Sequence, residues 1–343
     1  MQNSPNLVSA DRPTADSVLG EARSLFEPVY RTVVETLPSA LAEIVGQHRG
    51  WHTAGASKTG GRAIRPALVI ASARTVPGCS GHTDAVLAAA VSVELAHDFT
   101  LIHDDVMDAD EMRRGRPAVW AEFGVGPAIL AGDALFALAV DLLAERAPAA
   151  TSTLTRALRT LCEGQSADLT FEQQSDVDIE ACLRMAAGKT GALLEAACAL
   201  GGRTAGGTER QVDILRRFGA HVGLAYQIAD DLRGIWAHPA ATGKRAHTDL
   251  VRRKKTVPVV AALCSDTAAG RELRRRYATP SAACIEETVD LADLVERAGG
   301  RRHAEALLRQ HCDSARDLLV RLGSPPDRLG DLRALVTLIE RWH

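Results

Sequence analysis

The spacing of hydrophobic residues along most of the chain predicts α-helices. In the stretch 21–45, EARSLFEPVYRTVVETLPSALAEIV, hydrophobic residues recur at steps of three and four, which places them on one face of a helix. A second stretch, 85–115, is almost entirely hydrophobic up to His97, as expected for a helix surrounded by others. The same reasoning predicts helices over 67–76, 127–145, 150–174, 177–201, 208–235, 256–265, 281–298, 301–322 and 329–341.

These helices are expected to form one all-α domain. Residues 1–17 are rich in Ser, Pro and Asp and predict a flexible N-terminal tail, which leaves 18–343 for the domain. The segments 52–66 and 236–248 are polar, contain Gly, and predict loops; the second is long enough to serve as a lid over a site. We find no strand pattern and no internal repeat.

Composition supports this picture and excludes several classes of protein. Aromatic residues make up only 4% of the chain, which disfavours sheets, and the net charge of −3 argues against a nucleic-acid partner. No uninterrupted hydrophobic run reaches about 18 residues, so no transmembrane segment is predicted. The seven cysteines form no CxxC pair and are interpreted as small buried side chains in a reducing cytoplasm.

The first candidate for chemistry is an aspartate cluster at the end of the hydrophobic helix, in LIHDDVMDADEMRRG. Asp104 and Asp108 share one helix face, and Asp105 flanks them. Crowded carboxylates repel one another unless a cation compensates, and oxygen ligands of this kind suit Mg²⁺. The alternative is a solvated acidic helix end.

A second cluster, in YQIADDLRGIW, places Asp230 and Asp231 after hydrophobic residues, with Gln227 one turn earlier. Neighbouring helices could bring the two clusters face to face across one cavity. Cationic residues in turn-rich segments could hold phosphate oxygens beside them, although each alone is more often a surface charge. They are Arg62, Arg65, Arg113, Arg114, Lys189, Lys244 and Lys255.

With these motifs in order, the chain resembles the trans-type polyprenyl synthetase family, and bacterial geranylgeranyl diphosphate synthases within it. The motifs are GGRAIRP (60–66), LIHDDVMD with RRGRP, GDALFALA (132–139), EGQSADL (163–169), AAGKTGALLEAA (186–197), YQIADDLRG (226–234) and TGKRAHTDLVRRKKTVPV (242–259). The resemblance implies an isoprenoid synthase-type bundle around a central apolar cavity, and a cytoplasmic homodimer.

The resemblance also implies a role for each matching residue. Asp104, Asp108 and Asp230 would bind Mg²⁺, three ions per site, with Asp105 and Asp231 in or beside that shell. The allylic diphosphate would be held by Arg113, Lys189, Thr190, Gln227, Lys244 and Lys255. Isopentenyl diphosphate would be held by Arg62, Arg65, His97 and Arg114, and Gly61 would let the loop approach it. His103 could be structural.

The implied reaction joins two substrates. Positive charge stabilises the departing allylic diphosphate, the isopentenyl double bond attacks the allylic cation, and a proton is then lost. Two positions depart from the family pattern, Arg62 where Lys is usual and Gly234 where a third Asp often stands. The first could change isopentenyl affinity, and the second weakens the case for a full second metal shell.

Residues before the first aspartate cluster suggest the product length. Phe99 is five residues before Asp104, roughly 7.5 Å along a helix, with the small Thr100 next to it. This arrangement, without an insertion in DDVMD, resembles members that form geranylgeranyl diphosphate, with Phe99 as the floor. Ala96, one turn below Thr100, would leave room for a longer product. Phe99 could equally be an ordinary core residue.

Four alternatives stay open. The product could be farnesyl diphosphate or a chain of C25 and longer. A class I terpene cyclase shares the fold and a DDxxD, but usually carries a second motif of Asn, Ser and Glu. A non-catalytic partner subunit would usually lack aspartates that this chain keeps. A helical scaffold would leave the aspartate and arginine clusters without explanation.

Overall fold

Helices account for nearly all regular structure in the computed structural model, which describes residues 13–51, 61–174, 176–236, 248–278 and 285–342. The α-helices are α1 (Ala15–Val34), α2 (Ser39–Arg49), α3 (Ile64–Arg74), α4 (Asp84–Met107), α5 (Val119–Phe123), α6 (Val125–Arg146), α7 (Pro148–Gln173), α8 (Ile179–Ala186), α9 (Ala192–Thr204), α10 (Glu209–Trp236), α12 (Thr248–Val251), α13 (Val257–Leu263), α14 (Ala268–Tyr277), α15 (Ile285–Arg297), α16 (Gly300–Leu322) and α17 (Gly330–Glu340). A π-helical turn spans Ala187–Gly191, and a 3₁₀ turn spans Pro326–Leu329. The strands β1 (Met112–Arg113) and β2 (Arg116–Pro117) form a short antiparallel hairpin. The predicted all-α class is confirmed.

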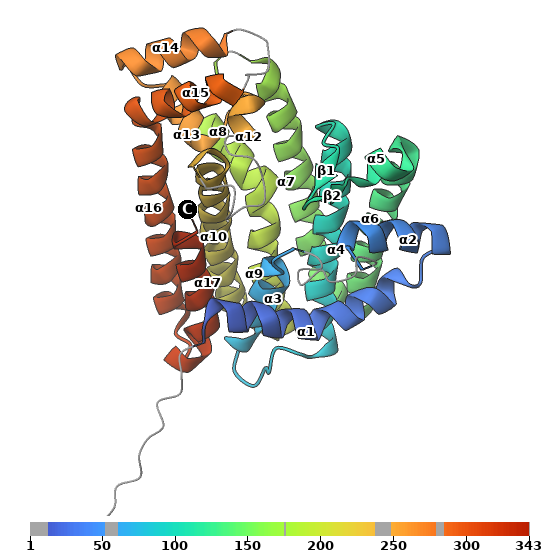
Figure 1. Ribbon diagram of the computed structural model, residues 1–343. Coiled ribbons are helices and arrows are strands. Elements are labelled where there is room, and N and C mark those ends of the chain that lie inside the picture. The colour runs from blue at the N-terminus through green and yellow to red at the C-terminus, as the bar shows by residue number, and fades with distance from the viewer. Residues whose placement is uncertain (1–12, 52–60, 175, 237–247, 279–284, 343) are drawn as a thin grey trace, which may run out of the picture.

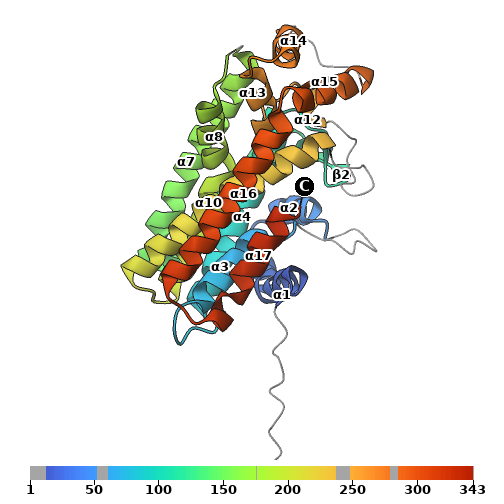
Figure 2. The ribbon, with the colours of Figure 1, turned by 90° about the vertical axis from the view of Figure 1, so that its left-hand side faces the viewer.

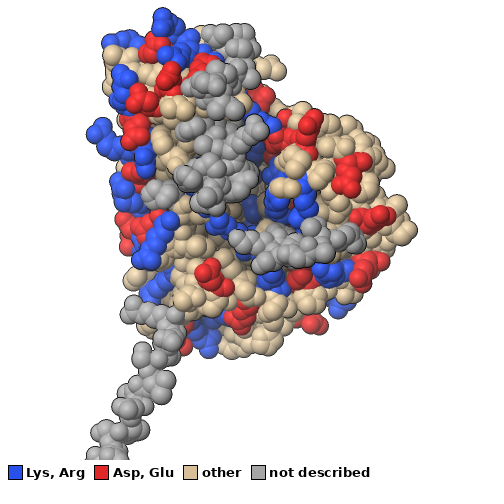
Figure 3. Space-filling view, viewed as in Figure 1, with Lys and Arg blue, Asp and Glu red and all other residues tan. Residues whose placement is uncertain are grey.

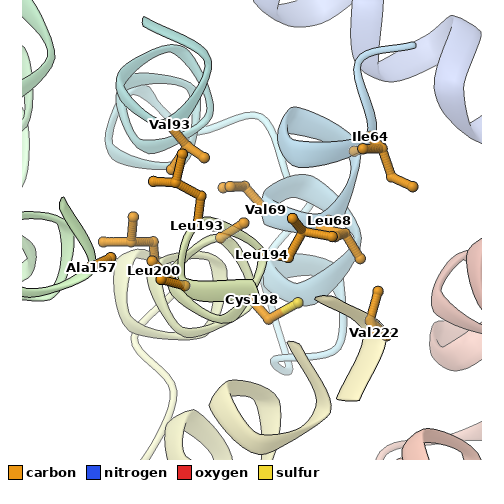
Figure 4. Packing of buried hydrophobic residues seen from close by; sticks show 14 of the residues in the cluster. Ile64, Leu68, Val69, Val93, Ala157, Leu193, Leu194, Cys198, Leu200 and Val222 are labelled. Atoms are coloured by element: carbon orange, nitrogen blue, oxygen red, sulfur yellow. The ribbon is translucent and has the colours of Figure 1, made fainter. Parts of the chain in front are cut away.

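The long helices α4, α7, α9, α10 and α16 run side by side, and α1 crosses one end of this bundle (Figures 1 and 2). At the opposite end, α14 and α15 lie across the bundle (Figure 1). The core forms where α3, α4 and α9 meet, and Figure 4 shows Val69, Val93 and Leu193 packed together there. These three side chains are at most 1% exposed. The bundle is therefore held chiefly by burial of aliphatic side chains.

Helix α4 is the central helix that the sequence predicts. Its hydrophobic residues from Val86 to Ala96 are buried almost without exception. It ends at Met107, earlier than the predicted break at Gly115, and Asp108 forms its C-cap. Ala109 and Arg114 then adopt positive φ angles of 53°, and the chain turns back as the β1–β2 hairpin. The hairpin thereby returns Arg113 toward the aspartates that it follows in sequence.

Some predicted boundaries are wrong. Helix α1 begins at Ala15, inside the predicted tail, because the Thr14 side chain accepts a hydrogen bond from the backbone N of Ser17 and caps the helix. Pro38 separates α1 from α2 where one continuous pattern was expected. The predicted helix 177–201 contains a π turn, and the short helices α5, α12 and α14 were not predicted.

Two helices are long and apolar enough to cross a membrane by length and composition alone, a property that core helices of soluble proteins share, so the absence of a transmembrane segment stays a prediction. In α4 the relevant window is 67% buried inside the protein, as for a core helix, whereas in α6 it is 33% buried. Large hydrophobic side chains exposed on α6 are Val125, Ile129, Leu130 and Phe136. Helix α6 therefore presents an apolar face that the rest of the described chain does not cover.

The cysteines fit the predicted role in part. Cys182, Cys198 and Cys312 are buried, and burial raises the pKa of the Cys198 and Cys312 thiols to about 12. Cys162 and Cys264 are exposed, contrary to that interpretation. No disulfide joins the six cysteines in the described residues.

Candidate active site

The aspartates at the end of α4 face inward and meet a guanidinium from the hairpin. Arg113 Nε donates a hydrogen bond of 2.8 Å to Asp105 Oδ1, and its Nη2 lies 3.9 Å from Asp104 Oδ2. Burial raises the pKa of Asp105, although Arg113 opposes the shift. Asp105 Oδ2 and Asp108 Oδ1 are buried without a hydrogen-bond partner in the described structure. Buried carboxylate oxygens without a partner are costly in a native fold, so these two favour the binding of a cation.

Lys189 reaches the same cluster from the π turn. Its Nζ lies 3.1 Å from Asp104 Oδ1 and 2.6 Å from Asp168 Oδ2 on α7. The approach requires a glycine, because a Cβ on Gly164 would lie 2.2 Å from the backbone N of Lys189. Burial would lower the pKa of Lys189, but the carboxylates of Asp104 and Asp168 raise it, so the ammonium stays charged. A π turn at this position is typical of functional sites.

Asp168 was not predicted, although it lies within the quoted motif EGQSADL. A single aspartate on a helix carries no local pattern, and only the packing of α7 against the π turn identifies its partner. In the folded chain Asp168 binds the Lys189 ammonium together with Asp104, and so helps to position it.

The two aspartates of the second cluster, Asp230 and Asp231, have different surroundings. Gln227 Nε2 donates to Asp231 Oδ1 at 2.6 Å, and the backbone N of Val257 donates to Asp231 Oδ2 at 2.9 Å. Burial raises the pKa of Asp231 to about 8, against the effect of the Val257 N–H. Thr190 donates to Gln227 Oε1. Asp231 thus ties α10 to the start of α13, whereas Asp230 is exposed and available to a ligand.

The ammonium beside Asp108 belongs to Lys254, which was not predicted as a site residue. Lys254 Nζ lies 3.0 Å from Asp108 Oδ2, while the predicted Lys255 donates to the backbone oxygen of Phe171. Burial would raise the pKa of Asp108, but Lys254 lowers it, so the carboxylate stays ionised. Lys254 and Lys255 are consecutive residues with different partners, and the sequence alone could not tell which of the two lies beside Asp108. Lys244 lies outside the described residues.

The fold brings together several of the residues predicted for isopentenyl diphosphate: Gly61 lies against Arg114, and the charges of Arg65 and Arg114 act on His97. A Cβ at Gly61 would lie 2.8 Å from Arg114 Nη2, so a larger residue at this position would displace the end of the Arg114 side chain. Arg65 is 7% exposed, and its Nε is buried without a hydrogen-bond partner in the described structure. Burial and Arg65 together hold the pKa of His97 well below its usual value, so the imidazole is neutral. Figure 3 shows basic side chains lining a hollow on this face.

A buried ionic network lies next to His97, one of the residues predicted to bind isopentenyl diphosphate. Arg49 Nη1 lies 2.9 Å from both Glu94 Oε1 and Asp98 Oδ2, and its Nη2 lies 2.6 Å from Glu27 Oε2. Tyr30 donates to Asp98 Oδ2 at 2.8 Å. Burial would raise the pKa of Asp98, but Arg49 holds it well below its usual range. The network joins α1, α2 and α4 next to His97.

Similarity to known proteins identifies the family of the chain. Residues 53–294 match the polyprenyl synthetase family. The chain is 43% identical to a geranylgeranyl diphosphate synthase of Mycobacterium tuberculosis, covering 95% of this chain and 93% of that protein. It is 39% identical to a (2E,6E)-farnesyl diphosphate synthase of the same species, covering 98% and 96%.

A polyprenyl synthetase from Streptomyces coelicolor has the same fold, with a TM-score of 0.88 and 39% identity over 95% of this chain and 99% of that one. The chain belongs to the polyprenyl synthetase family. It is therefore a prenyltransferase, and the family resemblance and fold predicted from its motifs are confirmed. The apolar cavity expected between the helices stays a prediction.

In this prenyltransferase the predicted chain-length residues lie on α4, and one of them, Phe99, contacts α6. The Phe99 ring makes edge contacts with His103 at 5.5 Å and with Phe136 at 5.6 Å between centroids. His103 Nε2 lies 3.0 Å from the backbone oxygen of Ile129, which supports a structural role for this histidine. The Thr100 hydroxyl donates to the His97 oxygen at 2.7 Å. Ala96 is fully buried one turn below.

Gly234, where a third aspartate is common in the family, packs against another carboxylate. A Cβ at this position would lie 2.0 Å from Asp249 Oδ2, so a side chain here would displace Asp249. The described residues contain no group of three or more metal-ligating side chains close enough to hold an ion alone. A divalent metal, which this family uses, would thus need oxygens from a bound diphosphate as well.

Proposed function

We propose that this prenyltransferase condenses isopentenyl diphosphate with an allylic diphosphate, dimethylallyl, geranyl or farnesyl. One observation carries the proposal: cations from three separate elements, Arg113, Lys189 and Lys254, converge on the aspartates of α4. Two of these carboxylates keep buried oxygens without partners in the described residues. An arrangement of alternating charges suits a metal-bridged diphosphate, which carries several negative oxygens.

The residues fit Mg²⁺, which we propose as the cofactor, three ions per site. Asp104, Asp108 and Asp230 would hold it, since Asp231 is occupied by Gln227 and Val257. Bound Mg²⁺ would stabilise negative charge on the departing diphosphate. The protein side chains add to that effect: the Lys189 ammonium stays charged, Lys254 lies beside Asp108, and Arg113 orients the Asp105 carboxylate.

The second substrate would sit against the Gly61 region. Arg65 and Arg114 supply positive charge there, and neutral His97 can donate a hydrogen bond to a phosphate oxygen. Holding both diphosphates places the isopentenyl double bond beside the allylic carbon, which lowers the entropic part of the barrier. The released diphosphate then accepts the proton lost from the product. Apolar side chains between α4 and α6 would keep water from the cation.

We propose geranylgeranyl diphosphate as the main product, with farnesyl diphosphate as the alternative. The proposal is supported by the position of Phe99, whose ring packs against Phe136 below the aspartates and can limit chain growth. Both product lengths occur in the names of the relatives described above. Sizing the products formed from each allylic primer tests the proposal, and a dominant C15 or C25 product would contradict it.

Replacing Phe99 by alanine is expected to lengthen the product by one or more isopentenyl units, because it removes a bulky ring from the path of the chain. The measurement is chromatography of the dephosphorylated products. A matched control is Phe26→Ala, which removes an equally bulky ring buried under α1 rather than below the aspartates. An unchanged product distribution in Phe99→Ala would show that the ring is only a core contact.

We also propose that the enzyme is a cytoplasmic homodimer that pairs through α6. The support is the exposed apolar face of this helix, with Leu130 at 60% and Phe136 at 42% exposure. A second copy would bury this face and remove the apolar surface from water. Light scattering that gives the mass of a single chain would contradict the dimer, and Leu130→Glu should weaken it.

A further inference from the structure

Trp342, which follows α17, lies at the centre of a cluster of two arginines and a tyrosine. The Arg62 guanidinium lies 4.0 Å from the centroid of the Trp342 ring, and the Arg233 guanidinium lies 4.8 Å from it. The Tyr226 ring packs against the same indole with a centroid distance of 4.7 Å. Three segments that are far apart in sequence therefore meet at this indole.

The two guanidiniums have no carboxylate partner within ion-pair distance in the described part of the chain. Arg62 is exposed and Arg233 is partly exposed, so a ligand can reach both. Their like charges oppose each other, and the aromatic face between them compensates only in part. Among the described residues, the Trp342 indole N–H is also buried without a hydrogen-bond partner. Two guanidiniums and a free N–H donor together suit an anion with several oxygens.

The cluster borders the residues already assigned to the second substrate. Arg62 follows Gly61, which lies against Arg114. Arg233 comes one helical turn after Asp230 on α10, so it faces the same side of the bundle as the second aspartate cluster. Arg233 lies within the motif YQIADDLRG but was not singled out in it, and Trp342 lies outside the quoted motifs, so only the fold brings both residues to Arg62.

We propose that Arg233 and Trp342 form part of the subsite for the diphosphate of isopentenyl diphosphate. Arg233 supplies a second guanidinium opposite Arg62. Trp342 positions both guanidiniums through its ring and donates its indole N–H to a phosphate oxygen. The inference rests on the proposed function, since it names further residues of the same site.

The first test compares steady-state kinetics of Arg233→Ala, Trp342→Ala and Trp342→Phe with the unaltered enzyme. We expect the KM for isopentenyl diphosphate to rise about tenfold or more in the two alanine variants, because each loses a charged or hydrogen-bonding contact. The KM for the allylic substrate should change less than twofold. Trp342→Phe keeps a ring but loses the N–H, so its KM should lie in between.

Arg301→Ala is a matched control, because Arg301 also stacks on an indole, that of Trp236, at 5.2 Å. It should leave both KM values unchanged. An equal rise of both KM values in Arg233→Ala and Trp342→Ala, or no rise in either, would overturn the proposal. Thermal unfolding of each variant identifies any that fails to fold, and Arg233→Lys then replaces Arg233→Ala.

The second test is binding without turnover. Isopentenyl diphosphate is titrated into the protein in EDTA while tryptophan fluorescence is recorded. We expect a saturable change that Trp342→Phe abolishes, that inorganic diphosphate reproduces and that isopentenyl alcohol does not. A change that persists in Trp342→Phe would overturn the inference. If the unaltered enzyme shows no isopentenyl transfer at all, the proposed function fails; if it is active and the variants match it, only this inference fails.

Discussion

Replacing Asp108 by asparagine is expected to lower kcat/KM by about a thousandfold, which corresponds to about 4 kcal/mol. The amide keeps the shape of the side chain but removes the charge that faces both Lys254 and the proposed metal. The Asp108 side chain is only 4% exposed, so water compensates little for the loss. Initial rates over a range of Mg²⁺ concentrations measure the effect.

The control is Asp317→Asn on α16, where the carboxylate is exposed and forms no ion pair within the described residues. It should keep full activity. A second readout separates metal binding from folding: Mg²⁺ with inorganic diphosphate should raise the melting temperature of the unaltered protein and of Asp317→Asn, but little in Asp108→Asn. Activity of Asp108→Asn within tenfold of the unaltered enzyme would exclude Asp108 as a metal ligand.

Replacing Arg49 by alanine is expected to reduce the free energy of unfolding by about 3–5 kcal/mol. The substitution leaves the carboxyl groups of Glu94 and Asp98 buried, with exposures of 2% and 0%, without the guanidinium that lies 2.9 Å from each. Tyr30 also loses the cation that lies 4.5 Å above its ring. Urea denaturation followed by circular dichroism measures the change.

Arg74→Ala provides the comparison, because Arg74 also joins two carboxylates, Glu21 and Asp331, but its side chain is 21% exposed. Solvent screens that pair of contacts, so we expect a loss of about 1 kcal/mol. Similar losses in Arg49→Ala and Arg74→Ala would mean that burial does not strengthen the network around Asp98. Arg49 binds Asp98, the residue that follows His97 on α4. The Arg49→Ala variant should therefore also bind isopentenyl diphosphate more weakly.

Local sequence patterns were sufficient to predict the long helices and to single out the aspartates as candidates. The periodicity of hydrophobic residues predicts α4, α6, α10 and α16 because each buries one stripe or nearly its whole surface. It fails at α12 and α14, where short polar helices depend on packing against α13 and α15. It also fails at the π turn, since one inserted residue leaves no mark in a hydrophobic pattern.

Local sequence patterns could not predict which residues would contact the site residues in the folded chain. Asp168 and Lys254 are the clearest cases, since each is identified only by the side chain that the fold brings to it, Lys189 and Asp108. The same holds for the buried network of Arg49, whose acids come from α1 and α4. Charged residues that pair over long sequence separations resemble surface residues until the chain folds.

The most direct test of the proposed condensation is the transfer of labelled isopentenyl diphosphate to an allylic primer by the purified chain alone. The account predicts incorporation with dimethylallyl, geranyl or farnesyl diphosphate, dependent on Mg²⁺ and abolished by EDTA, with a C20 diphosphate as the main product. No incorporation from any primer would contradict it. Release of a cyclic hydrocarbon instead would identify a terpene cyclase.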